Sequence, residues 1–186
     1  MSRRSNVAHA ITSAACAVLL SAAASSGASA EGREAGACTI TGTSSADTLI
    51  GTPMRDVICG RGGADDIRGK AGDDVIYGGR GDDDIVGGYG GDWIFGGRDR
   101  DQVDGATGDD RIRGNIGNDR LISGGSGSDR LFGGRGRDAC LDARDRQNGN
   151  DTVRGGPGED GYRADTGDIV TSAEPAIGCP TETPPP

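Results

Sequence analysis

Residues 78–86 read Gly-Gly-Arg-Gly-Asp-Asp-Asp-Ile-Val, and this nine-residue unit decides the fold because its pattern recurs along the chain. An Asp returns at every ninth position from Asp47 to Asp119, and after one additional residue the series continues with Asp129 and Asp138. A fixed period of this kind is typical of repeat architectures, in which each unit stacks on its neighbours.

Each recurring Asp is followed two residues later by a side chain that can be buried. These side chains are Leu49, Ile58, Ile67, Ile76, Ile85, Ile94, Val103, Ile112, Leu121, Leu131 and Cys140. We therefore predict a three-residue strand in each unit, with its middle side chain pointing inward, and a six-residue turn before the next strand. Two units make one coil of 18 residues, and coils stack at about 4.8 Å, the spacing of paired strands. The sequence thus predicts an all-β fold, a right-handed parallel β-roll.

Gly dominates the turn positions of the repeat. It stands first in the units at Gly42, Gly51, Gly60, Gly69, Gly78, Gly87, Gly96, Gly105, Gly114, Gly124 and Gly133, and fourth at Gly63, Gly72, Gly81, Gly90, Gly108, Gly117, Gly127 and Gly136. Such turns need residues that tolerate positive φ and close backbone approach. Ser45, Met54 and Asp99 replace the fourth Gly, so we expect strained or loosened turns there.

The unit at 78–86 matches the pattern GGxGxDxUx, where U is a large apolar residue. This pattern resembles the calcium-binding nonapeptide of RTX proteins, the haemolysin-type calcium-binding repeat. The resemblance covers residues 42–141 and implies calcium bound in the turns.

Stacking of the coils places the aspartates in two columns. One column holds Asp47, Asp65, Asp83, Asp101, Asp119 and Asp138, and the other holds Asp56, Asp74, Asp92, Asp110 and Asp129. Carboxylates one strand spacing apart repel each other, and a hard divalent cation between them removes the conflict. Calcium fits best because it accepts six to eight oxygen ligands in flexible geometry.

The columns contain five and four gaps, so at most nine Ca²⁺ ions fit between successive aspartates. We expect the best sites between Asp65 and Asp83, between Asp74 and Asp92, between Asp92 and Asp110, and between Asp119 and Asp138. Backbone carbonyls would complete the coordination near Gly60, Gly63, Gly69, Gly72, Gly78, Gly81, Gly87, Gly90, Gly108 and Gly117.

Residues 1–30 have the pattern of a secretory signal peptide. Arg3 and Arg4 precede an Ala-rich apolar stretch, which is followed by the cleavage pattern Ala28-Ser29-Ala30. The apolar stretch is too short and too polar to span a bilayer. The whole chain carries a net charge of −9, which becomes more negative once the two arginines are removed, so nucleic acid is not an expected partner. We expect a secreted protein, extracellular or associated with the cell surface.

The remaining segments divide around the roll. We predict an N-terminal cap at 31–41, the calcium-binding roll at 42–141, degenerate repeats with a C-terminal cap at 142–179, and a disordered Pro-rich tail at 180–186. In an exported protein an even number of cysteines favours disulfides. Of the three possible pairings of Cys38, Cys59, Cys140 and Cys179, we favour Cys38 with Cys59 and Cys140 with Cys179.

The chemistry of the repeat points to ion binding without catalysis. The only histidine, His9, lies in the predicted signal, and no segment remains to house a catalytic domain. Two small apolar side chains per coil bury little surface, so we expect the repeats to be disordered until calcium binds. We predict a secreted calcium-binding protein with a structural or adhesive role.

One strand face is richer in aromatic side chains and poorer in acids. Val75, Tyr77, Trp93 and Phe95 point outward on it and form a candidate surface for an extracellular glycan, a protein partner or a second copy. The alternative function is therefore a calcium-dependent accessory module that binds polysaccharide or protein through this aromatic face. An aromatic ladder that only stiffens neighbouring strands is the alternative interpretation of the same residues.

Overall fold

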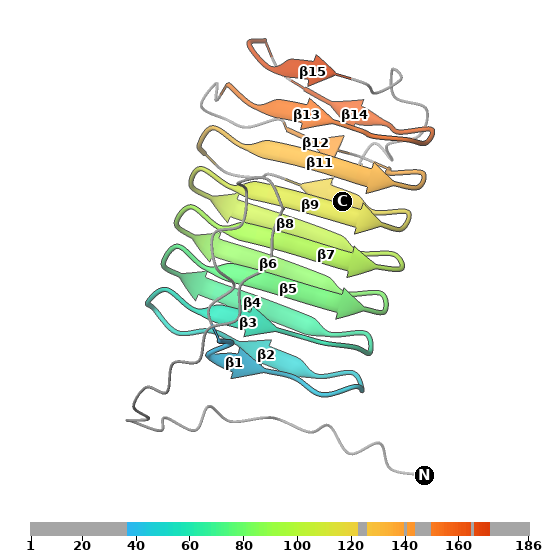
Figure 1. Ribbon diagram of the computed structural model, residues 1–186. Coiled ribbons are helices and arrows are strands. Elements are labelled where there is room, and N and C mark those ends of the chain that lie inside the picture. The colour runs from blue at the N-terminus through green and yellow to red at the C-terminus, as the bar shows by residue number, and fades with distance from the viewer. Residues whose placement is uncertain (1–36, 123–125, 140, 144–149, 165, 172–186) are drawn as a thin grey trace, which may run out of the picture.

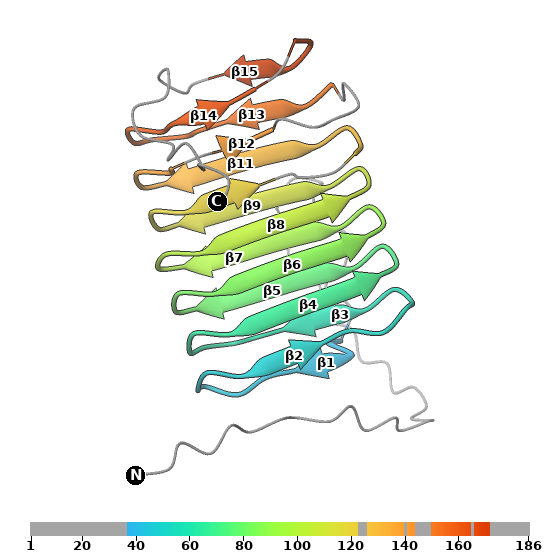
Figure 2. The same cartoon turned by 180° about the vertical axis from the view of Figure 1, so that it is seen from behind.

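The computed structural model describes residues 37–122, 126–139, 141–143, 150–164 and 166–171. Over these residues the chain winds as a β-solenoid, with coils stacked from β1 and β2 at one end to β15 at the other (Figures 1 and 2). The described residues form strands and turns, and none of them belongs to a helix that could cross a membrane. The predicted leader, Cys140, Cys179 and the Pro-rich tail lie outside the described residues.

The strands form two parallel sheets, which we call the odd sheet and the even sheet after the numbering of their strands. The odd sheet contains β1 (Ile40–Thr41), β3 (Val57–Cys59), β5 (Val75–Arg80), β7 (Trp93–Arg98), β9 (Arg111–Ile116), β11 (Arg130–Arg135), β13 (Thr152–Arg154) and β15 (Ile169–Thr171). The even sheet contains β2 (Thr48–Ile50), β4 (Asp66–Ala71), β6 (Asp84–Tyr89), β8 (Gln102–Thr107), β10 (Arg120–Ile122), β12 (Leu141–Asp142) and β14 (Tyr162–Arg163).

The register confirms the predicted coil of 18 residues. Ile58 pairs with Ile76, Ile76 with Ile94, and Ile94 with Ile112 in the odd sheet. These residues point between the sheets and are completely buried, as are their counterparts in the even sheet. The core is a ladder of single aliphatic side chains from each unit, namely Leu49, Ile58, Ile67, Ile76, Ile85, Ile94, Val103, Ile112, Leu121, Leu131, Leu141 and Val153, with Ala143 beside them.

The central strands are longer than the three residues expected from the sequence. β4 to β9 and β11 each contain six residues, because pairing continues through the first Gly residues of the following unit. Gly79, for example, pairs with Gly97, and Arg80 pairs with Arg98. The turns are correspondingly tighter than the six residues predicted, which brings the aspartates close to the backbone of the neighbouring coils.

Both sheets continue beyond Asp138 despite irregular spacing. β13 pairs with β11 through Leu131 and Val153, and β15 extends the odd sheet further. In the even sheet Leu141 fills the core position for which Cys140 was expected, because β12 pairs with β10 in a register that joins Ile122 to Asp142.

A disulfide joins Cys38 and Cys59, which are 21 residues apart. It connects the segment just before β1 to β3, so it cross-links the first coil of the solenoid. This is the first of the two pairings that the sequence analysis favoured.

Candidate metal-binding turns

The recurring aspartates lie where the chain turns from one sheet to the other, and all of them are buried. Exposure is at most 7% for Asp47 and falls to 0% for Asp92 and Asp138. Their position follows from the strand alternation. An apolar residue two positions later points into the core, so the Asp side chain points inward at the turn as well. Burying this many carboxylates requires compensating interactions.

From Asp65 onward, one carboxylate oxygen of each recurring Asp accepts a hydrogen bond from the backbone of the preceding coil. The Oδ1 atom of Asp92 accepts a hydrogen bond of 2.8 Å from the backbone N–H of Asp74, and Oδ1 of Asp110 accepts one of 2.8 Å from Asp92. The same contact, at 2.7–3.1 Å, recurs from coil to coil up to Asp168. The sequence analysis anticipated the columns but not this hydrogen-bonded connection, which uses only half of each carboxylate.

The other oxygen, Oδ2, is buried without a hydrogen-bond partner along most of the described ladder. This holds for Asp65, Asp74, Asp83, Asp92, Asp101, Asp110, Asp119, Asp138 and Asp160. A buried acceptor without a donor costs about 1–3 kcal/mol, and more when it is charged. A repeated row of such oxygen atoms suits a positively charged ligand.

In the regular described units, the first Gly leaves a space beside this oxygen. A Cβ atom on Gly78 would lie 2.5 Å from Oδ2 of Asp83 and 2.5 Å from the carbonyl oxygen of Gly96 in the next coil. A Cβ atom on Gly69 would lie equally close to Asp74 Oδ2 and to the carbonyl oxygen of Gly87. These glycines keep a cradle open, and oxygen atoms line it from two successive coils.

Positive φ angles occur at the second and fourth positions of the repeat, whereas the sequence analysis had stressed the first and fourth. Gly79 has φ 121° and Gly81 has φ 110°. Asp99, which replaces the fourth Gly, itself adopts φ 80°, and its Oδ2 atom accepts a hydrogen bond from the N–H of Gly81. Asp tolerates this conformation better than most residues, so the turn keeps its shape.

The first two units close their turns in a different way. Oδ2 of Asp47 accepts hydrogen bonds from the N–H and the hydroxyl of Thr43, at 2.6 and 2.8 Å. Oδ2 of Asp56 accepts the same pair from Thr52, at 2.7 and 2.8 Å. Here a Thr supplies the donors that the later units lack. Neither Thr was singled out from the sequence. Each stands directly after the first Gly of its unit and two residues before the residue that replaces the fourth Gly, and this position was a usable signal.

The ladder also extends beyond the predicted set of aspartates. Oδ1 of Asp160 accepts a hydrogen bond from the backbone N–H of Asp138. Oδ2 of Asp160 is buried without a hydrogen-bond partner, as in the regular units. Asp151 accepts a hydrogen bond from Asp129 in the other column. Both follow the signal used for the regular units, since Val153 and Tyr162 stand two residues after them. The sequence analysis assigned this segment to the degenerate repeats at 142–179 and did not include the two aspartates among the metal ligands.

Burial raises the pKa of the inner aspartates. The pKa of Asp83 rises to about 6, that of Asp92 to about 7, that of Asp101 to about 8 and that of Asp110 to about 9. The main cause is loss of hydration, which disfavours the charged form; the backbone N–H from the preceding coil opposes the rise, and neighbouring carboxylates add to it. Asp101 and Asp110 in the ion-free roll therefore retain protons at neutral pH, and a cation bound to the same oxygens would replace these protons.

This proton retention predicts that calcium binding depends on pH. Because the folded-state pKa values lie above the unfolded value near 4, the ion-free roll is most stable in acid and loses stability as pH rises from about 4 to about 9. A cation on the same oxygens displaces the protons. In chelator we therefore expect more β-structure near pH 5, where the ion-free roll keeps its protons, than at pH 8, where the chain is disordered. Calcium added near pH 5 should displace these protons and release them into weak buffer. A β-sheet signal in chelator that does not change with pH would contradict this assignment.

The donor atoms of the turns suit a hard cation. Within the described ranges, no three His, Cys, Asp or Glu side chains come together as a metal-binding group. A cation in the glycine cradles would therefore use main-chain carbonyl oxygens together with the carboxylates. Oxygen-only coordination is typical of Ca²⁺, which accepts more ligands and looser geometry than Mg²⁺.

The predicted aromatic face lies on the outside of the odd sheet and is packed as a cross-strand ladder. The rings of Tyr77 and Phe95 stack with their centroids 5.0 Å apart and their planes 8° from parallel. The guanidinium of Arg111 lies 5.0 Å from the centre of the Trp93 ring. Val75, Tyr77, Trp93 and Phe95 are all half-buried as a result. The stacking of Tyr77 on Phe95 matches the aromatic ladder that the sequence analysis gave as its alternative interpretation, whereas the arginine over the Trp93 ring was not anticipated.

The model of the RTX calcium-binding nonapeptide repeat family matches the chain over residues 41–70, 60–88, 86–121, 121–139 and 147–168. The matched ranges contain both columns of aspartates and the glycine cradles beside them. The last range includes the irregularly spaced Asp151 and Asp160. No curated protein sequence matches the chain.

Proposed function

Because the chain belongs to the RTX calcium-binding nonapeptide repeat family, we propose that it is a secreted protein whose repeats bind Ca²⁺ between successive coils and fold on binding, in a structural or adhesive role. The observation that carries this proposal is the row of buried Oδ2 atoms without hydrogen-bond partners beside the first glycines of the described units. Calcium would supply the positive charge that these oxygens require.

The residues proposed to hold calcium are the aspartates of both columns and nearby main-chain carbonyls. Asp65, Asp74, Asp83, Asp92, Asp101, Asp110, Asp119, Asp129 and Asp138 belong to the predicted set, and we add Asp151 and Asp160. Asp47 and Asp56 occupy the same columns, but their Oδ2 atoms bond to Thr43 and Thr52. We assign these two to turns that close without an ion.

Coupling of calcium to folding follows from the thin core. Each coil buries only two aliphatic side chains, whereas ordering the backbone costs about 1–2 kcal/mol per residue. Ion binding then contributes directly to the folding free energy, as in other small metal-dependent domains. Together with the predicted signal peptide, this suits a chain that is exported unfolded and folds where calcium is abundant. The proposal assigns no catalysis to the protein.

Circular dichroism of the chain lacking residues 1–30 tests the proposal. In a chelator at pH 7.5 we expect a spectrum dominated by disordered chain, and millimolar Ca²⁺ should produce a β-sheet spectrum. Mg²⁺ at the same concentration is the control and should have little effect, because it prefers a compact octahedral site. An identical spectrum with chelator and with calcium would contradict the proposal.

Thr52→Val tests the assignment of the first units. Val keeps the shape of Thr but removes the hydroxyl that donates to Asp56 and accepts from the N–H of Met54. We expect a loss of about 1–2 kcal/mol in the unfolding free energy of the calcium-loaded protein, with no change in the number of ions bound. The measurements are thermal unfolding and calcium titration, and a lower ion count would show that this unit holds calcium after all.

A further inference from the structure

A hollow lies on the outside of the odd sheet over β9, β11 and β13, and the columns of residues that line it continue over β5 and β7; we call this strip the groove. Its floor follows a column in which Gly79, Gly97, Asn115 and Gly134 pair in register. One wall is the column Tyr77, Phe95, Arg113, Phe132 and Arg154, and the other is the column Arg80, Arg98, Ile116 and Arg135. The groove exists because glycine leaves the outward position between these two walls almost empty.

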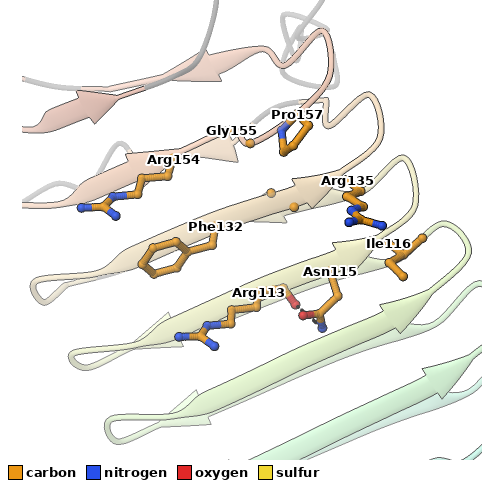
Figure 3. Close-up of a pocket in the computed structure, with 11 residues that line it drawn as sticks. Arg113, Asn115, Ile116, Phe132, Arg135, Arg154, Gly155 and Pro157 are labelled. Carbon is orange, nitrogen blue, oxygen red and sulfur yellow. Dashed lines mark hydrogen bonds between the residues drawn. The ribbon is translucent and has the colours of Figure 1, made fainter. Parts of the chain in front are cut away.

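The part of the groove over β9, β11 and β13 forms a pocket of about 560 Å³. Figure 3 shows Arg113 and Arg154 on either side of Phe132, with Ile116, Arg135 and Pro157 toward the other end of the strands. Glycine backbone from β11 and from the segment after β13 lies between these side chains. This volume is in the range of sites that hold small organic ligands or a short segment of a polymer.

The walls are cationic on a protein that is acidic as a whole. In the described strands β5, β7, β9, β11 and β13, the three columns contain Arg80, Arg98, Arg113, Arg135 and Arg154 and no Asp or Glu. The outer face of the even sheet, by contrast, carries Asp66, Asp84, Asp104 and Asp142. A local basic strip on a chain with net charge −9 attracts anions only where the strip lies.

Two arginines stack on the ring of Phe132. The guanidinium of Arg113 lies 5.4 Å from the centre of the ring, and that of Arg154 lies 5.7 Å from it. Arg154 is exposed, and stacking uses the face of its guanidinium while the in-plane N–H groups remain accessible. Those N–H groups match the geometry of a carboxylate, and the ordering of the Arg154 side chain by the ring reduces the entropy lost when the anion binds.

We propose that this groove, defined by the three columns above, binds a linear polysaccharide that carries carboxylate groups. The walls repeat once per coil and the floor has almost no side chains, so a chain of sugar rings can lie along the stack with its carboxylates toward the arginines. Phe132, Ile116 and Pro157 provide apolar surface for the C–H faces of the rings. Because the groove exists only where coils stack, this inference rests on the proposed function.

An acidic polypeptide fits the groove less well. The floor is the middle of a sheet, where backbone N–H and C=O groups already pair with neighbouring strands. An extended peptide binds most strongly at a sheet edge, where those groups are free. A polysaccharide needs no backbone pairing and can use the arginine N–H groups alone.

Binding of fluorescent hyaluronan oligosaccharides to the calcium-saturated protein tests the proposal. Dextran of similar length is the uncharged control, and polyglutamate represents an acidic polypeptide. The variant R135Q/R154Q removes two exposed cations from the groove. The matched control R68Q/R100Q removes two exposed cations outside it, each of which forms an ion pair with an Asp. A second groove variant, Asn115→Asp, adds a negative charge to the floor with almost no change in size.

We expect hyaluronan binding by the wild type, a loss of at least about tenfold in both groove variants, and an unchanged affinity in the control variant. Circular dichroism of the same samples must show the calcium-induced fold, and its absence would count against the proposed function instead. Failure of the folded protein to bind hyaluronan, equal binding by the groove variants, or equally tight binding of polyglutamate would overturn the proposal. Equal binding of dextran would do so too, because charge would then play no part.

Discussion

Gly78→Ala should prevent the coil around Asp83 from closing on calcium. The new Cβ would lie 2.5 Å from Oδ2 of Asp83 and 2.5 Å from the carbonyl oxygen of Gly96, closer than real Cβ contacts allow. The methyl group therefore occupies the cradle and also pushes two coils apart. We expect a loss of roughly 3 kcal/mol or more in the unfolding free energy of the calcium-loaded protein, and at least one ion fewer in a calcium titration.

Gly62→Ala is the matched control for this substitution. A Cβ on Gly62 would have its nearest neighbours at 3.7–4.0 Å, which is ordinary van der Waals contact. We expect a change within about 0.5 kcal/mol, since surface substitutions without steric conflict usually have small effects. Equal destabilisation by the two substitutions would mean that Gly is needed for chain flexibility and not for the cradle.

Asp92→Asn should weaken calcium binding without reducing the residual β-structure of the ion-free chain. The Asn side chain can still accept the hydrogen bond from Asp74, but an NH₂ group replaces the Oδ2 atom that we assign to calcium. In calcium, we expect one or two fewer ions and a midpoint raised several-fold. In chelator at pH 8, the variant should retain at least as much β-structure as the wild type, because the pKa of Asp92 is about 7 and Asn removes a buried charge.

Asp84→Asn is the control. Asp84 is exposed on the even sheet, and its replacement by Asn changes the net charge by the same amount. Its calcium stoichiometry should equal that of the wild type. If Asp92→Asn destabilised the calcium-loaded protein but left its ion count and calcium midpoint unchanged, Asp92 would be a purely structural residue.

The sequence predicted the features that depend on strict periodicity. The nine-residue recurrence fixed which aliphatic side chains form the core, and Leu49 through Leu131 are buried as expected. The same recurrence placed the aspartates in two columns, which the hydrogen bonds from Asp to Asp confirm. Stacked repeats make such predictions possible because every coil has the same neighbours.

Other features could not be predicted because they depend on atoms that the periodic pattern does not describe. The pattern places an Asp in each turn, but whether its second oxygen has a donor depends on a local residue such as Thr43 or Thr52. It also places Phe132 on the outer face, but not the arginines over its ring. Leu141 took the core position expected for Cys140 because one irregular spacing changed the register.

Calcium titration by isothermal calorimetry, with circular dichroism recorded on the same samples, tests the central claim most directly. The claim is that the buried Oδ2 atoms of the ladder bind calcium and that this binding folds the roll. It predicts several ions bound per chain, with the β-sheet signal rising over the same range of calcium concentration. A chain that binds no calcium, or that binds it with no change in its β-sheet signal, would contradict the claim.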